Sequence, residues 1–138
     1  WRRATFTKGF VRFTPDKPAP LDTEFAVAAD GKHLYLAVRC HEPTPERIKA
    51  PQRPRDELVG DSIEVFLQPG LDGHHFVQLA LNAAGVQYDC LMSHHGARVR
   101  MDFDMAWTSA VGREPQAWTA EVAIPLSQLL VRPSEDES

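Results

Sequence analysis

The sequence contains no run of apolar residues long enough to cross a bilayer as a helix, which takes about 18 to 20 residues. Basic residues are also scarce, because 15 Lys and Arg stand against 19 Asp and Glu and give a formal net charge of -4 at pH 7. A phosphate backbone normally requires a basic protein face. The sequence therefore argues against membrane insertion and against a nucleic-acid partner.

Motifs of common catalytic sites are missing as well. There is no GxSxG nucleophile elbow, no glycine-rich phosphate loop and no HExxH zinc motif. The carboxylates of Asp61 and Glu64 stand three residues apart, so on a strand they project to opposite faces and cannot flank one glycosidic bond. We therefore expect that this chain is not an enzyme by itself.

Metal-binding patterns are equally weak. His74-His75 and His94-His95 are adjacent pairs, and on a strand each pair offers at most one ligand to a given ion. Acidic residues near expected turns have oxygens suited to calcium, although none follows an EF-hand pattern; they are Asp22, Glu24, Asp30, Asp61 and Asp72. We expect no defined metal site and treat structural calcium as an option without a location.

Only two cysteines occur, Cys40 and Cys90, and both are expected in strands, on the core side that they share with apolar residues. Their spacing excludes a CxxC redox or metal motif. Two interpretations stay open, a pair of buried free thiols or a disulfide formed in an oxidising compartment.

What the sequence does contain is a series of short alternating segments typical of an all-β protein. Apolar and polar residues alternate with a period of two in strands expected at 25–27, 34–40, 62–68, 74–82, 86–92, 105–111 and 117–124. Turn residues separate them, including Asp30-Gly31 and 69–73, and only 125–130 suggests a helix. We predict an antiparallel β-sandwich of two packed sheets, of the jelly-roll or immunoglobulin-like type, over 1–132. Residues 133–138 are expected to be an acidic tail or the start of a further segment.

Polar residues on the strand faces opposite the expected core predict a binding surface. We expect ligand contacts from Arg39, Glu64, Gln78 and Asn82, accompanied by the rings of Tyr35, Phe66 and Phe76. Planar polar groups bracket neighbouring sugar hydroxyls, and aromatic rings supply flat apolar area. The proline-rich segment 41–58 is expected to be a long loop that borders this surface. A structural Arg39–Glu64 ion pair on a solvated sheet is the alternative.

The three tryptophans are expected in different environments. Trp118 shares its strand face with Ala120, Val122 and Ile124 and is therefore expected in the core. Trp107 and Trp1 lie near element ends, where a ring can either cap a core or hold a ligand.

Five segments in order resemble the family 9 carbohydrate-binding modules of the DOMON-like β-sandwich superfamily. They are Trp1-Arg2-Arg3-Ala4, residues 34–40, Gly60-Asp61-Ser62-Ile63-Glu64-Val65-Phe66-Leu67, Leu81-Asn82 with Gly85, and 118–126. The resemblance implies a non-catalytic saccharide-binding module, an accessory to bacterial secreted polysaccharide-degrading glycoside hydrolases, located outside the cell or in the periplasm and sometimes holding structural calcium.

The chain departs from the family pattern at two positions. Leu58 stands where sugar-binding members carry a clamping tryptophan, and Gln78 stands where a basic residue is common. Two alternative functions therefore stay open. One is a β-sandwich retained as a structural or interaction domain without a ligand. The other is binding of haem b, as in a second branch of the superfamily, through Met92, Met101 or Met105 with His94 or His95.

Overall fold

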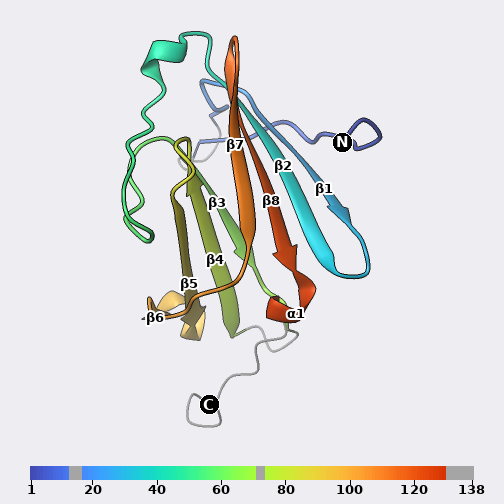
Figure 1. The fold of residues 1–138 in the computed structure, drawn as a ribbon, viewed down its shortest axis with the longest axis vertical. Coiled ribbons are helices and arrows are strands. Elements are labelled where there is room, and N and C mark those ends of the chain that lie inside the picture. The colour runs from blue at the N-terminus through green and yellow to red at the C-terminus, as the bar shows by residue number, and fades with distance from the viewer. Residues whose placement is uncertain (13–16, 71–73, 130–138) are drawn as a thin grey trace.

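The computed structural model describes residues 1–12, 17–70 and 74–129 (Figure 1). Within these residues the strands are β1 (Thr23–Ala29), β2 (His33–His41), β3 (Ser62–Leu67), β4 (His75–Asn82), β5 (Gln87–Ser93), β6 (Arg98–Arg100), β7 (Thr108–Glu114) and β8 (Ala117–Pro125). Helical turns in these same described residues are limited to Pro45–Arg47, His94–Gly96 and α1 (Leu126–Leu129). The expected turn at 71–73, which contains Asp72, and the expected tail at 133–138 lie outside the described residues.

The strands form two antiparallel sheets that pack face to face. One sheet has the order β1-β2-β8-β7 and the other β3-β4-β5-β6. Figure 1 shows β7, β8, β2 and β1 beside one another from the centre to the right, and β5, β4 and β3 on the left. The predicted all-β sandwich is confirmed.

The core fills the space between the sheets. The inward positions of β4 are Val77, Leu79 and Leu81, none more than 1% exposed, as the alternation predicts. They pack with Trp118 and Ile124 from β8 and with other apolar residues of both sheets. Burying this apolar surface is the main force that holds the two layers together.

Local hydrogen bonds explain two of the turns. Between β1 and β2, Oδ1 of Asp30 accepts hydrogen bonds of 2.7 Å from the backbone N–H groups of Lys32 and His33. Between β4 and β5, Oδ1 of Asn82 accepts hydrogen bonds from the N–H groups of Ala84 and Val86. Short polar side chains that bond backbone N–H groups in this way stabilise turns.

Some element boundaries differ from those expected. β6 was not predicted, because three exposed residues carry no periodic signal. β7 begins at Thr108 and not at 105, since Met105 and Trp107 are buried in the core outside the ladder. The predicted helix is a single turn, α1. None of the helical segments in the described ranges is long and apolar enough to span a membrane.

The segment between β2 and β3 is a long loop, as predicted. It runs beside β5 on the outer side of the second sheet (Figure 1). The N–H of Asp56 donates to the carbonyl of Gln87 on β5, and the N–H of Asp61 donates to the carbonyl of Lys49 within the loop. The first bond ties the loop to the second sheet, and the second closes the loop on itself.

Candidate functional site

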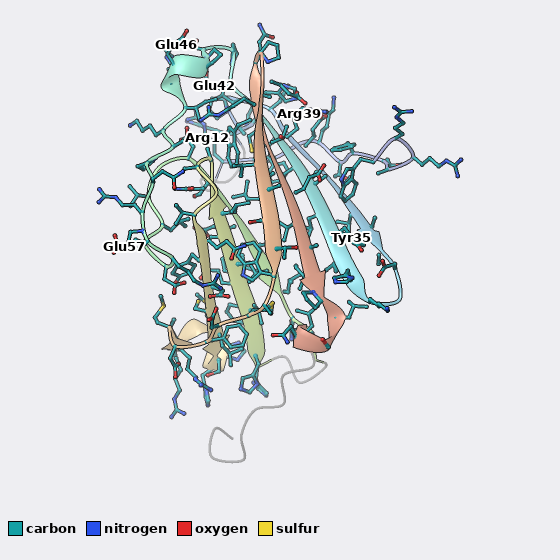
Figure 2. All side chains as sticks on the ribbon, in the orientation of Figure 1. Arg12, Tyr35, Arg39, Glu42, Glu46 and Glu57 are labelled. Atoms are coloured by element: carbon teal, nitrogen blue, oxygen red, sulfur yellow. The ribbon has the colours of Figure 1, made fainter. Side chains whose placement is uncertain are left out.

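The four predicted ligand contacts do not share one face. Glu64, Gln78 and Asn82 belong to the β3-β4-β5-β6 sheet, whereas Arg39 lies on β2 in the other sheet. Figure 2 shows Arg39 and Tyr35 along β2 and Glu57 on the loop at the opposite side of the molecule. The prediction that Arg39 and Glu64 meet is therefore wrong, and so is the alternative of an Arg39–Glu64 ion pair.

Arg39 instead joins three elements of its own sheet. Its Nη1 donates a 2.6 Å hydrogen bond to Glu24 on β1, and its Nε donates a 3.1 Å hydrogen bond to Glu114 at the end of β7. The guanidinium also lies 5.6 Å from the ring centre of Phe6. The hydrogen bond from Arg39 is the largest cause of a lowered pKa of Glu24, with smaller help from Lys8.

Asn82 is a structural residue. It has no exposed surface, its Nδ2 donates hydrogen bonds of 3.1 and 3.0 Å to the carbonyls of Pro51 and Val59, and its Oδ1 bonds the β4–β5 turn. With every donor and acceptor used inside the protein, Asn82 has no group left for a ligand. Its role is to tie the long loop to the end of β4.

Glu64 and Gln78 do lie together on the outer face of β3 and β4. Nε2 of Gln78 donates a 3.3 Å hydrogen bond to Oε2 of Glu64, and Oε1 of Gln78 accepts from Sγ of Cys90 at 3.4 Å. Gln78 is buried and Glu64 is exposed. Gln78 therefore positions the carboxylate of Glu64, and Glu64 presents its remaining acceptor capacity to solvent.

Aromatic rings border this carboxylate. Phe66 is 55% exposed and lies 6.2 Å from Phe76, measured between ring centres. Tyr88, on the same face of β5, donates a 3.3 Å hydrogen bond to the sulfur of Met101. The hydrogen bond with Cys90, followed by burial, raises the pKa of Tyr88 to about 12, so the phenol stays protonated.

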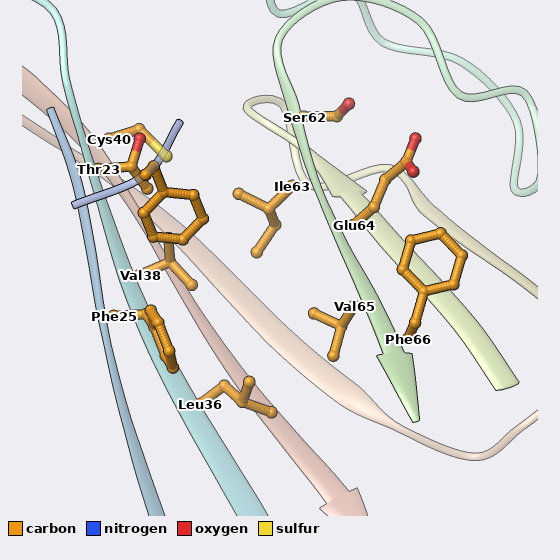
Figure 3. Close-up of a pocket in the computed structure, with 11 residues that line it drawn as sticks. Thr23, Phe25, Leu36, Val38, Cys40, Ser62, Ile63, Glu64, Val65 and Phe66 are labelled. Carbon is orange, nitrogen blue, oxygen red and sulfur yellow. The ribbon is translucent and has the colours of Figure 1, made fainter. Parts of the chain in front are cut away.

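A cavity of about 500 Å³ opens between the sheets beside β3. Figure 3 shows Ile63 and Val65 pointing from β3 toward Phe25 and Val38, whereas Glu64 and Phe66 point away from them. The lining is mostly apolar, with Thr23, Ser62 and Glu64 as its polar members, and the Glu64 side chain points away from the apolar ones. Mostly apolar walls offer few partners for sugar hydroxyls. The cavity is therefore a poor place for a saccharide, and the outer face that presents Glu64 and Phe66 is a better one.

Both cysteines are free thiols, as one of the two interpretations expects. Cys40 lines the cavity between the sheets, and burial raises its pKa to about 11. Cys90 has no exposed surface, and its contact with Gln78 places it on the outer face of β5. The expectation that both cysteines lie on the core side is wrong for Cys90.

The residues considered for metal or haem do not converge. Among the described residues, no group of three or more His, Cys, Asp or Glu is placed to hold a metal ion. Met105 is buried in the core, whereas Met101 is 47% exposed and contacts Tyr88. His94 and His95 lie on the exposed turn after β5. This arrangement does not favour a haem held between a methionine and a histidine.

The tryptophans separate by exposure. Trp118 and Trp107 are 4% and 5% exposed and belong to the core, which confirms the prediction for Trp118. Trp1 is 41% exposed and lines a hollow together with residues of the first sheet.

No protein-family model matches the sequence, and no curated protein matches it. Solved structures do resemble the fold. A candidate carbohydrate-binding protein from Bacteroides uniformis ATCC 8492 has a TM-score of 0.72 at 17% identity, over 96% of this chain and 65% of that chain. A family 9 carbohydrate-binding module from Caldicellulosiruptor kristjanssonii in complex with cellotriose has a TM-score of 0.65 at 14% identity, over 92% of this chain and 58% of that chain.

A family 9 module from the same organism in complex with glucose has a TM-score of 0.66 at 13% identity, over 97% of this chain and 63% of that chain. The chain has the fold of a family 9 carbohydrate-binding module. It spans less than two thirds of each of these solved chains.

Leu58 stands at the position where the resemblance to family 9 implies a clamping tryptophan. Leu58 is half-buried and precedes Val59, whose carbonyl accepts the hydrogen bond from Asn82. The position where the resemblance implies a tryptophan is thus part of the segment that Asn82 holds to β4. A leucine there supplies apolar contact but no flat ring for stacking.

Proposed function

We propose that this protein is a non-catalytic carbohydrate-binding domain that holds a saccharide on the outer face of β3, β4 and β5. The observation that carries the proposal is the exposed carboxylate of Glu64, positioned by Gln78 at 3.3 Å and bordered by the 55% exposed ring of Phe66. A carboxylate accepts hydrogen bonds from neighbouring hydroxyls, and a ring beside it covers the apolar face of a sugar.

The fold likeness supports the same ligand class. The Caldicellulosiruptor modules were solved with cellotriose and glucose, so a neutral glucose-based saccharide is the first ligand to test. We extend the proposal to an accessory role beside a polysaccharide-degrading glycoside hydrolase in an extracellular or periplasmic setting. Structural calcium belongs to this proposal through the family resemblance.

A glycan array with calcium present tests the function, followed by titration calorimetry with the saccharide that binds. We expect Glu64→Ala and Phe66→Ala each to lower the affinity by at least about tenfold, which corresponds to about 1.4 kcal/mol. Both side chains are exposed, so the melting temperature should stay close to that of the wild type. Glu46→Ala, at an exposed position of the long loop, is the matched control.

A second candidate function is an interaction domain that has kept the fold without a sugar site. Leu58, in place of the tryptophan that the family resemblance implies, is the observation that favours it. The array separates the two functions, because a folded domain that binds no glycan supports the interaction domain. Specific binding of a glycan that Glu64→Ala weakens by at least about tenfold supports the carbohydrate-binding domain.

A further inference from the structure

The outer face of the other sheet carries two adjoining hollows that the proposed site does not use. Residues of the N-terminal segment line hollows on this face, and Thr7 forms a bridge with Phe25 of β1. The hollows measure about 280 and 190 Å³, and both are lined by Trp1 and Glu121. Together they reach the lower part of the roughly 300–1,000 Å³ range of small-ligand sites.

Glu121 is an exposed carboxylate in the middle of β8. Its neighbours across the ladder are Ala37 on β2 and Ala110 on β7, whose small side chains leave the carboxylate open to approach. Among residues 1–12, 17–70 and 74–129, the side-chain carboxylate of Glu121 has no hydrogen-bond partner and no ion pair. Its full acceptor capacity is therefore available to a ligand.

The smaller hollow combines rings with polar groups held in place. Trp1 and Phe6 supply its rings, and Arg39 and Thr119 stand on its polar side. The guanidinium of Arg39 is held by the carboxylates of Glu24 and Glu114, so it enters the hollow already oriented. Groups oriented before binding lose little entropy when a ligand arrives.

The larger hollow has a similar composition. It is lined by Trp1, Tyr35 and the hydroxyl-bearing Thr108, in addition to Glu121. The hydroxyl of Tyr35 donates a 2.9 Å hydrogen bond to Asp30, which fixes the ring on the sheet (Figure 2). Each hollow thus offers an aromatic ring together with a hydroxyl and the shared carboxylate.

We propose that Trp1 and Glu121 form a second saccharide-binding site, on the sheet opposite to Glu64. Its ligand class is a neutral oligosaccharide with one sugar residue in each hollow. Glu121 accepts hydrogen bonds from hydroxyl groups of both sugar residues, and the indole of Trp1 covers the apolar face of one sugar ring. This inference rests on the proposed function, because it assigns a second face to the same ligand class. A domain with two such faces binds two strands of a polysaccharide and gains avidity.

The test uses the full chain and a panel of cellotriose, xylotriose, mannotriose and galactotriose. Calorimetry gives the stoichiometry, and tryptophan emission reports on the second site, because Trp1 is 41% exposed whereas Trp107 and Trp118 are 5% and 4% exposed. We expect two sites in the wild type and one in Glu64→Ala. In the Glu64→Ala background, Glu121→Gln should weaken the remaining site by about tenfold and Trp1→Phe should remove the emission change.

Glu46→Gln makes the same chemical change at an exposed position of the long loop and should leave both sites intact. The second site would be overturned if the wild type showed a single site that Glu64→Ala abolishes and if Glu121→Gln and Trp1→Phe kept the wild-type affinity. The proposed function would still stand in that case. Absence of binding to every saccharide of the panel and of the array by the folded wild type would overturn both.

Discussion

Nη2 of Arg55 lies 2.7 Å from Oδ2 of Asp89, a carboxylate with no exposed surface. The same oxygen accepts hydrogen bonds of 2.9 Å from the N–H of Met105 and 3.2 Å from Nε1 of Trp107. Arg55 belongs to the long loop, Asp89 to β5, and the other two residues precede β7. One buried carboxylate thus joins three segments that are distant in the sequence.

Replacing Arg55 tests this junction. Arg55→Ala removes a charge-assisted hydrogen bond from a buried carboxylate, so we expect the free energy of unfolding to fall by about 2–3 kcal/mol. Urea denaturation measures it. Arg53→Ala, an exposed arginine of the same loop, should change stability by no more than about 0.5 kcal/mol. Equal stability of the two variants would show that Arg55 does not hold the loop.

Replacing Asn82 tests whether this residue stabilises the fold or contacts the ligand. Asn82→Ala leaves two carbonyls and two N–H groups without their partner, and we expect a loss of about 2–4 kcal/mol in the free energy of unfolding. The saccharide affinity of the folded fraction should be unchanged, as calorimetry below the melting transition can show. Lost affinity at unchanged stability would restore Asn82 as a ligand contact.

The contact between Arg39 and Glu24 makes stability depend on pH. Arg39 lowers the pKa of Glu24 below its usual 4.5, so the contact stabilises the fold above that pH, and the stabilisation is lost as pH falls through the folded-state pKa. We expect the unfolding free energy of the wild type to fall more steeply below pH 4.5 than that of Glu24→Gln. Urea titrations at a series of pH values measure both slopes, with Glu46→Gln as the control. Parallel curves for wild type and Glu24→Gln would contradict the prediction.

The thiols should react slowly in the folded protein. Burial raises the pKa of Cys40 to about 11 and also raises that of Cys90. A shift from 9.0 to about 11 lowers the thiolate fraction of Cys40 at pH 8 by about a hundredfold. Ellman's reagent should therefore label the native protein slowly. After unfolding in guanidinium without reductant, the reagent should label two thiols. Fast labelling of native Cys40, assigned with Cys40→Ser, would contradict its burial.

Local sequence patterns were enough to predict most of the strands and, for β2, β3, β4 and β8, the direction in which their side chains point. The period of two is a property of the extended backbone, so alternation alone identified Ile63 and Val65 as inward and Glu64 as outward. The Asp30-Gly31 turn and the core position of Trp118 followed from equally local rules. The long loop was recognisable because its prolines fit neither a strand nor a helix.

Which outer faces coincide, and what covers them, depends on how the strands pair and pack in the folded protein. Strand pairing is non-local, and β2 pairs with β1 and β8, so Arg39 lies on the sheet opposite to Glu64 although both point outward. Burial on an outer face depends on the segment that lies across it. Asn82 has no exposed surface because the loop carbonyls of Pro51 and Val59 meet its amide, and alternation within β4 carries no information about that loop.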